Sequence, residues 1–140
     1  MKPSGIRASK RALQHLLDGE RFIRPWKFRV VSVGDGTCTL ELPHRPALER
    51  PGGIINGPAL MAAADCAMWL AIKSRIGMDH DALTSDLNTA FLAPAKAHSV
   101  LCTARIVREG RRRIYGVAEC HDRRGKIFTH HTITYSRLEA

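Results

Sequence analysis

A run of twenty residues, GPALMAAADCAMWLAIKSRI (57–76), constrains the fold of this chain more than any other feature. The run consists of strong helix formers, and Pro58 stands where a first-turn proline is tolerated. Gly77 follows at a position typical of a helix C-terminus. We therefore predict one long helix over 57–76. Because apolar residues surround its axis, we expect this helix to be buried on every side.

Asp65 places a single charge in the middle of this helix. At about 100° per residue, Asp65 shares one side with large residues, and small residues share the other. The large residues are Met61, Met68, Trp69 and Ile72, and the small ones are Ala59, Ala63, Ala67 and Ser74. A carboxylate in apolar surroundings is costly unless it is paired or functional. Asp65 is therefore the leading candidate for a general base or nucleophile, and the alternative is a structural Asp held by strand hydroxyl groups.

Alternating strand patterns lie on both sides of the long helix. Residues 27–42 read as a hairpin around a Gly-Asp-Gly turn, and 43–53 read as a loop. After the helix, four strand-like runs follow at 83–92, 99–108, 112–121 and 126–135. A curved antiparallel sheet of about six strands, wrapped around one long helix, is the economical packing of this order. We thus predict an α+β fold in a single domain over 27–140.

The first 26 residues are predicted to form an N-terminal arm. Residues 9–17 have leucines at helical spacing after a possible Ser9 cap, which predicts a short amphipathic helix. No apolar run reaches the roughly 20 residues of a membrane span, and the N-terminus lacks the apolar stretch of a secretory signal. We expect a cytoplasmic protein without a membrane partner.

The four cysteines show no metal-site spacing. Cys38, Cys66, Cys102 and Cys120 lie singly in apolar runs, without a CxxC pair or a histidine at zinc-ligand distance. Free cysteines usually behave as small hydrophobic residues. We expect reduced, buried thiols and no bound metal.

The net charge of +9 is concentrated in two segments. Residues 1–30 carry eight basic and two acidic side chains, and residues 105–126 carry eight and three. Such patches attract nucleic acid, anionic lipid or a phosphorylated small molecule, or they simply keep the chain soluble. With 6% aromatic residues, no zinc finger and no aromatic RNA-binding strand, the sequence argues against nucleic acid. Arg111, Arg112 and Arg113 suit phosphate binding, and a solvated hairpin end is the equal alternative.

Three segments carry a resemblance to a known family: PGGIINGPALMAAAD (51–65), TSDLNTAFLAPA (84–95) and VREGRRR (107–113). Together they resemble the hot-dog-fold acyl-CoA thioesterases of the phenylacetate-pathway (PaaI-like) type, over roughly residues 27 to 136. Many members have His-Gly-Gly at the helix start and an Asp nine positions after the His. Here Asn56-Gly57-Pro58 occupies that place, and Asp65 falls nine positions after Asn56. The resemblance implies a hot-dog fold, an acyl-CoA substrate, no cofactor beyond the CoA of that substrate, and a homodimer or dimer of dimers.

Thioester hydrolysis assigns candidate roles to these residues. The Gly57 N–H lies at the positive end of the helix dipole and could bind the oxyanion, whereas Pro58 has no N–H. Asn56 could cap the helix or bond the substrate, with capping favoured. Ser85 and Asn88, with Asp86, could orient a water or face solvent. Met61, Met68 and Trp69 would suit an aromatic or a medium aliphatic acyl group.

The spacing of Gly57 and Asp65 points to a shared site. Eight residues separate them on one helix, about 12 Å along its axis, so one thioester carbonyl cannot touch both. Two antiparallel helices across a two-fold axis would bring Asp65 of one chain to Gly57 of the other. We therefore expect an acyl-CoA thioesterase with two shared sites. A non-catalytic acyl-CoA-binding protein and a hot-dog hydratase are the alternatives, distinguished by thiol release and by enoyl absorbance.

Overall fold

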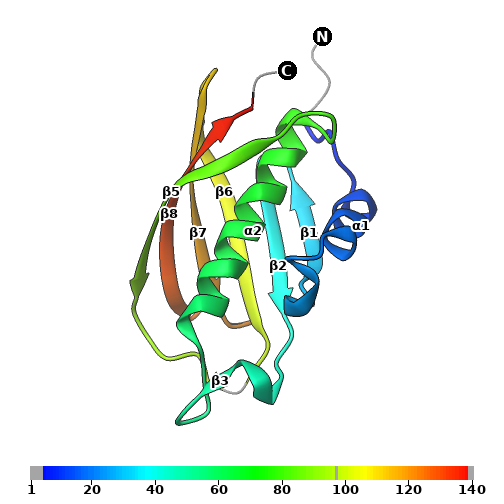
Figure 1. Cartoon of the computed structure of the whole chain (residues 1–140). Coiled ribbons are helices and arrows are strands. Elements are labelled where there is room, and N and C mark those ends of the chain that lie inside the picture. The colour runs from blue at the N-terminus through cyan, green and yellow to red at the C-terminus, as the bar shows by residue number, and fades with distance from the viewer. Residues whose placement is uncertain (1–4, 97, 139–140) are drawn as a thin grey trace.

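In the computed structural model, which describes residues 5–96 and 98–138, a six-stranded antiparallel sheet curves around one long helix (Figure 1). The helix is α2, Gly57–Ile76, and the strands lie in the order β1-β2-β6-β7-β8-β5. Their bounds are β1 Arg29–Gly34, β2 Thr37–Leu42, β5 Ala82–Phe91, β6 Val100–Glu109, β7 Arg113–His121 and β8 Ile127–Arg137. β3 (Glu49–Arg50) pairs with β4 (Ile54–Ile55) in the loop before α2. The predicted architecture is confirmed.

Local sequence signals fix both ends of α2. The Asn56 side chain accepts a hydrogen bond from the Ala59 N–H at 2.8 Å and so satisfies an N–H of the first turn. Gly77 ends the helix with a φ of 88°, and its N–H donates to the Lys73 carbonyl. Because caps, proline and glycine all agree, the helix begins and ends at the predicted residues.

The prediction that α2 is buried on every side is wrong. One stripe along the helix is only half-buried, and it consists of Met61, Ala62, Asp65, Cys66 and Trp69. A single curved sheet covers one side of a helix, so the opposite side stays uncovered in one chain. Met68 also departs from its predicted neighbours, because it lies fully buried against the sheet, where its Sδ and Cε occupy the space beside Gly116 of β7.

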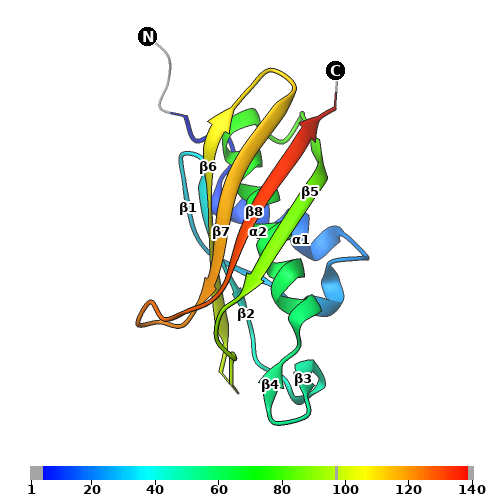
Figure 2. The ribbon, with the colours of Figure 1, turned by 90° about the vertical axis from the view of Figure 1, so that its left-hand side faces the viewer.

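The arm before the sheet packs against the domain. Its helix α1, Lys10–Gly19, is capped by Ser9 as predicted, and it buries Leu13 and Leu17. Gln14 ties α1 to the sheet, because its Oε1 accepts from the Val30 N–H at 2.7 Å. Two short 3-10 helices lie at Arg24–Trp26 and Pro46–Leu48. This packing fixes the segment between α1 and β1 beside α2 (Figure 2).

Three of the four cysteines are buried as expected, and Cys66 is half-buried. None of the four forms a disulfide. Among the described residues, no helix is long and apolar enough to cross a membrane. Within the same residues, no group of three His, Cys, Asp or Glu side chains could hold a metal ion.

Candidate active site

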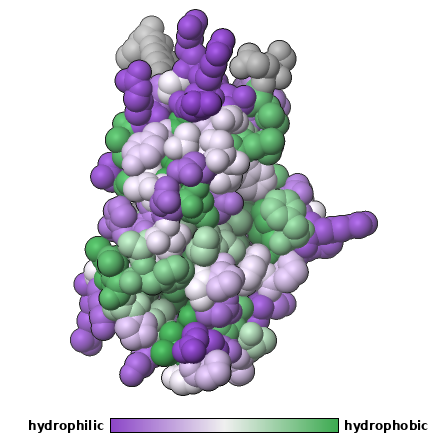
Figure 3. Space-filling view, turned by 60° about the vertical axis from the view of Figure 1, so that its left-hand side comes forward, coloured by the Kyte–Doolittle hydropathy of each residue, from purple (hydrophilic) through white to green (hydrophobic). Residues whose placement is uncertain are grey.

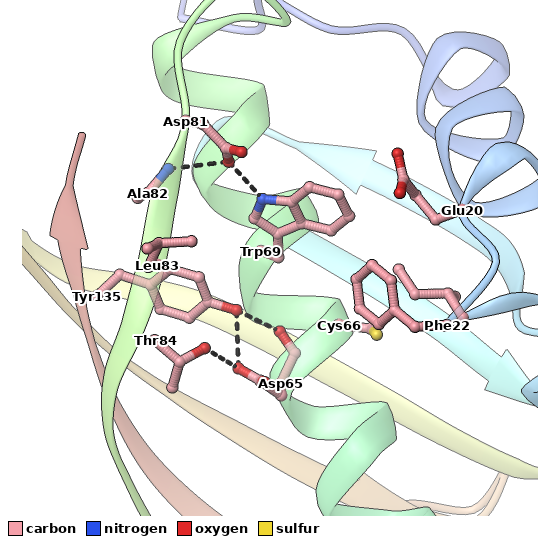
Figure 4. Close-up of a pocket in the computed structure, with 11 residues that line it drawn as sticks. Glu20, Phe22, Asp65, Cys66, Trp69, Asp81, Ala82, Leu83, Thr84 and Tyr135 are labelled. Carbon is pink, nitrogen blue, oxygen red and sulfur yellow. Dashed lines mark hydrogen bonds between the residues drawn. The ribbon is translucent and has the colours of Figure 1, made fainter. Parts of the chain in front are cut away.

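Asp65 is held by two hydroxyl groups from the strands beside α2 (Figure 4). Thr84 of β5 donates to Asp65 Oδ1 at 2.7 Å. The Tyr135 hydroxyl of β8 lies 2.7 Å from the same Oδ1 and 2.8 Å from the Asp65 carbonyl oxygen. No described residue donates to Oδ2. One carboxylate oxygen is therefore anchored and the other stays available for a substrate or a water.

The groups around this carboxylate keep their protons at neutral pH. Burial, and then the charge of Asp65, raise the pKa of Tyr135, so its hydroxyl remains a neutral donor. Burial, followed by the same charge, raises the pKa of the Cys66 thiol to about 12. Cys66 thus stays a thiol and does not compete as a nucleophile. Tyr135 and Cys66 are thus neutral neighbours of the Asp65 carboxylate.

A cavity of about 350 Å³ opens beside Asp65. Helix α2 forms its floor, β5 and Tyr135 form one wall, and the N-terminal arm forms the other (Figure 4). Its lining residues are Glu20, Phe22, Ile23, Asp65, Cys66, Trp69, Asp81, Ala82, Leu83, Thr84 and Tyr135. Most of this lining is apolar, which suits an acyl group with its carbonyl at Asp65.

Trp69 lines the cavity in a fixed orientation. Its indole N–H donates to Asp81 Oδ1 at 2.7 Å, and the Lys73 ammonium lies 5.8 Å from the centre of its ring. Burial acts to raise the pKa of Asp81, but bonds from Trp69 and the Ala82 N–H and the charge of Lys73 outweigh it, and the net pKa is lowered. Asp81 is therefore an ionised anchor for the ring.

The start of α2 has a different construction. Besides capping the helix, Asn56 donates through Nδ2 to the Leu48 carbonyl at 2.8 Å. Both polar atoms of its side chain are thus engaged within the chain, which confirms the favoured capping role; a contact of Asn56 to substrate stays a prediction. The Gly57 N–H has no acceptor among the described residues. A cavity of about 310 Å³ adjoins Gly57, Leu60 and Phe91.

The other predicted contacts do not gather at Asp65. Met61 lies on the half-buried stripe but not in the Asp65 cavity, and Met68 is buried beneath the sheet. A β-bulge between Thr84 and Asp86 interrupts the strand alternation at Ser85, which donates to the Thr134 carbonyl at 3.2 Å. Asn88 donates to Asp86 at 3.0 Å, which confirms that these two share a face. Both Ser85 and Asn88 lie outside the cavity lining.

Arg111, Arg112 and Arg113 are exposed at the turn between β6 and β7. With Ser136 and Arg137 they line an open groove. Within the described part of the chain, the side chains of the three arginines form no ion pair. Arg113 pairs with Ser136 in the sheet, one residue along β8 from Tyr135. The basic groove therefore lies close to β8, the strand whose Tyr135 bonds Asp65.

Sequence reasoning missed four residues that define the site: Thr84, Tyr135, Phe22 and Asp81. Thr84 and Tyr135 face each other across β5 and β8, and this register brings two hydroxyl groups from positions 19 and 70 residues beyond Asp65 onto one carboxylate. A buried tyrosine usually has a polar partner for its O–H, and that rule was the available signal.

Comparisons with known proteins agree with this fold. The thioesterase superfamily model matches residues 52–128, more than half of the chain, so this chain belongs to the thioesterase superfamily. The family is one of thioester hydrolases, and its matched segment contains Asp65 and Thr84.

The individual relatives described here are 17–29% identical to this chain. The candidate esterase Ta0293 of Thermoplasma acidophilum is 29% identical over 119 residues, covering 85% of this chain and 88% of the relative. The conserved protein PA5202 of Pseudomonas aeruginosa has a TM-score of 0.80 at 28% identity, covering 85% of this chain and 94% of that one. The thioesterase HI1161 of Haemophilus influenzae shares the fold, with a TM-score of 0.85 at 17% sequence identity. The match covers 94% of this chain and 91% of that one. The Escherichia coli PaaI protein of the phenylacetic acid degradation operon reaches 0.81 at 17%, covering 90% of each chain.

Proposed function

We propose that this protein hydrolyses an acyl-CoA thioester to the free acid and CoA, in the cytoplasm, as in the phenylacetate-pathway type of the family. The observation that carries the proposal is the Asp65 carboxylate. One of its oxygens is fixed by Thr84 and Tyr135, and the other borders a largely apolar cavity large enough for an acyl group. A titratable group positioned in the lining of a cavity is a candidate general base or nucleophile.

The oxyanion donor comes from a second copy of the chain in this proposal. Gly57 lies about 12 Å along the helix from Asp65, and the two residues adjoin separate cavities. The strand beside Asp65, β5, is an edge strand with the exposed apolar residues Leu83 and Phe91, and the exposed Leu92 follows it. Figure 3, which brings this edge forward, shows hydrophobic surface gathered on the lower half of the face. Pairing of two such edges would set two α2 helices antiparallel and complete both sites.

The reaction then needs one carboxylate, one backbone donor and one water. In the general-base route, Asp65 takes a proton from water as its oxygen attacks the thioester carbonyl. The Gly57 N–H of the other chain binds the oxyanion that forms. The intermediate collapses, the carbon–sulfur bond breaks, and Asp65 returns its proton to the CoA sulfur. In the nucleophilic route, the Asp65 carboxylate attacks the carbonyl, the carbon–sulfur bond breaks, and CoA leaves as its thiolate. Water then hydrolyses the anhydride to the free acid and Asp65, and the proton released in that step neutralises the thiolate.

The CoA portion would lie toward the β6–β7 turn. The guanidinium groups of Arg111, Arg112 and Arg113 are exposed and suited to the phosphates of CoA. They lie near the β8 end that supplies Tyr135, so one extended substrate can reach the arginines from the carbonyl position at Asp65.

A non-catalytic acyl-CoA-binding protein is the second candidate. Asn56 stands where many relatives of the resembled type have a histidine, and it is committed to the helix cap. A binding protein would keep the cavity and the arginines while releasing no thiol.

Thiol release from a panel of aromatic, short, medium and long acyl-CoAs separates the two candidates. We expect turnover by the wild-type chain, and a loss of roughly 100-fold or more in kcat for Asp65→Asn with an unchanged or raised Tm. Asp79→Asn, which removes an exposed carboxylate just after α2, is the control and should keep full activity. Near wild-type hydrolysis by folded Asp65→Asn would exclude the assignment, and saturable binding without thiol release would favour the second candidate.

A further inference from the structure

The N-terminal arm supplies a wall of the Asp65 cavity. Glu20, Phe22 and Ile23 line it together with Asp65 and Trp69 of α2 (Figure 4). These arm residues lie outside the segment matched by the family model, which begins at residue 52. The arm therefore adds a wall to the acyl end of the site that lies outside the matched segment.

The turn that presents Phe22 is well fixed. The Glu20 carbonyl accepts from the N–H groups of Ile23 at 3.1 Å and Arg24 at 3.0 Å. Ile23, next in the chain, is buried with 2% of its surface exposed. Phe22 itself is 72% exposed although it borders the cavity. A large aromatic ring held at the mouth of an apolar cavity gains contact area when a ligand enters.

The indole of Trp69 lines the cavity one turn of α2 beyond Asp65. Trp69 lies four residues after Asp65, so about 6 Å of helix separates the carboxylate from the indole. Asp81 fixes this indole through its N–H, as described above, and Asp81 itself accepts from the Ala82 N–H at 2.8 Å. An acyl group that starts at Asp65 thus meets a fixed aromatic side chain after the length of one ring or a short alkyl chain.

The charges around the cavity are all of one sign. Its lining contains the carboxylates of Glu20, Asp65 and Asp81 and no lysine or arginine among the described residues. Lys73 lies behind Asp81, with its ammonium 3.5 Å from the Asp81 carboxylate, and so is already paired. Glu20 forms no ion pair with any described residue. An acyl group that ends in a carboxylate would therefore be repelled at this end.

We propose that this cavity selects compact, uncharged acyl groups, with Phe22 and Trp69 as its walls and Glu20 as the group that excludes acyl chains ending in a carboxylate. This proposal rests on the proposed thioesterase function. It makes the arm residues and the Trp69 indole, which Asp81 holds, the residues that determine acyl specificity.

The charge selectivity is tested with two thioesters of equal length, hexanoyl-CoA and adipoyl-CoA. We expect wild-type kcat/KM to favour hexanoyl-CoA by at least tenfold, and Glu20→Gln to reduce that ratio severalfold, mainly by raising kcat/KM for adipoyl-CoA. Glu119→Gln removes a carboxylate paired with His130 elsewhere on the sheet, and it should leave the ratio unchanged. Equal rates for both substrates in the wild-type chain, or an unchanged ratio in Glu20→Gln, would overturn the proposal.

The size selectivity is tested with benzoyl-CoA, hexanoyl-CoA and palmitoyl-CoA. Trp69→Ala should raise kcat/KM for palmitoyl-CoA relative to hexanoyl-CoA at least fivefold, because the side chain that limits the space one turn beyond Asp65 is removed. Phe22→Ala should lower kcat/KM for benzoyl-CoA severalfold, whereas Tyr115→Ala, an exposed aromatic on β7, should not. Trp69→Phe keeps a ring, and it provides the test if Trp69→Ala does not fold. Unchanged rankings in folded variants would refute these roles.

The same rankings apply to binding, which keeps the proposal independent of turnover. Dissociation constants of these acyl-CoAs for Asp65→Asn, measured by calorimetry, should follow the same order and respond to the same Glu20 and Phe22 changes. Absent hydrolysis with this binding order would refute the thioesterase function and retain the selectivity. Hydrolysis by the wild-type chain, together with equal dissociation constants for all the acyl-CoAs, would retain the thioesterase function and refute the selectivity.

Discussion

The middle and the start of α2 carry the two halves of the proposed site, and they are built in opposite ways. Around Asp65, the side chains of Thr84 and Tyr135 fix a carboxylate at the edge of a cavity. At Gly57, the useful group is a backbone N–H, and the neighbouring side chain of Asn56 stabilises the helix start. The first half depends on the register of two strands, whereas the second depends on the helix start and the loop that precedes it. Neither half is sufficient for the chemistry.

Gly57→Val should have the largest effect among changes to the helix start. An added Cβ at this position would lie 3.1 Å from the Phe91 ring, so a branched side chain must displace the ring or the first turn. We expect a fall in kcat/KM of about 10²-fold, typical of losing one oxyanion donor. Gly19→Val is the control, since a Cβ there meets nothing within 4 Å. Full activity of folded Gly57→Val would show that the Gly57 N–H is not the oxyanion donor.

Tyr135→Phe tests the anchoring half. The ring remains in place while the hydroxyl that contacts Asp65 is lost. We expect roughly a tenfold fall in kcat and about 1 kcal/mol less stability, because one hydrogen bond to a charged group disappears. Activity assays and urea unfolding measure the two effects, and Tyr115→Phe serves as the control. A stability loss with unchanged kcat would make Tyr135 purely structural.

Replacing Arg111, Arg112 and Arg113 by alanine tests the part of the site farthest from both halves. The apparent KM for acyl-CoA should rise about tenfold while kcat is retained, because contacts to phosphate supply uniform binding. Hydrolysis of a short thioester without phosphate should not change. The control replaces Arg123 and Arg124 at the β7–β8 turn. Equal losses with both substrates would show that the arginines do not bind CoA.

Asn56→Ala should have the smallest effect on activity. Loss of a helix cap costs about 1 kcal/mol, and thermal unfolding should report it. The kcat/KM of the folded variant should stay within about twofold of wild type, since the Asn56 side chain is engaged by Ala59 and Leu48. A fall of more than tenfold would restore the prediction that Asn56 contacts the substrate.

The same contrast explains which features the sequence could predict. Asn56, Pro58 and Gly77 act within a few residues, so the bounds of α2 follow from local rules, and so does the cap. Asp65 is recognisable because a charge within an apolar helix is unusual. The strand order also follows from turns and alternation, and the six strands of the sheet lie within two residues of the predicted runs.

The contacts of Asp65 could not be predicted in this way. Thr84 and Tyr135 meet because of the register between β5 and β8 and the bulge at Ser85. The rule that a buried tyrosine has a polar partner does not say which residue that partner is. The angle around the helix axis predicts that Met68 lies on the side of Asp65. Gly116 has no side chain, and Met68 fills the space that this leaves against the sheet. Phe22 lies in an arm whose position depends on packing against α2 and β1.

A mixed dimer tests the central claim that the two halves come from different chains. Asp65→Ala removes the carboxylate, Gly57→Val disturbs the donor, and each homodimer should be nearly inactive. In a heterodimer, isolated with two affinity tags after co-expression, one site receives both defects and the other receives neither. We predict recovery of up to half of the wild-type activity per heterodimer. Heterodimers that form and remain as inactive as either homodimer would contradict it.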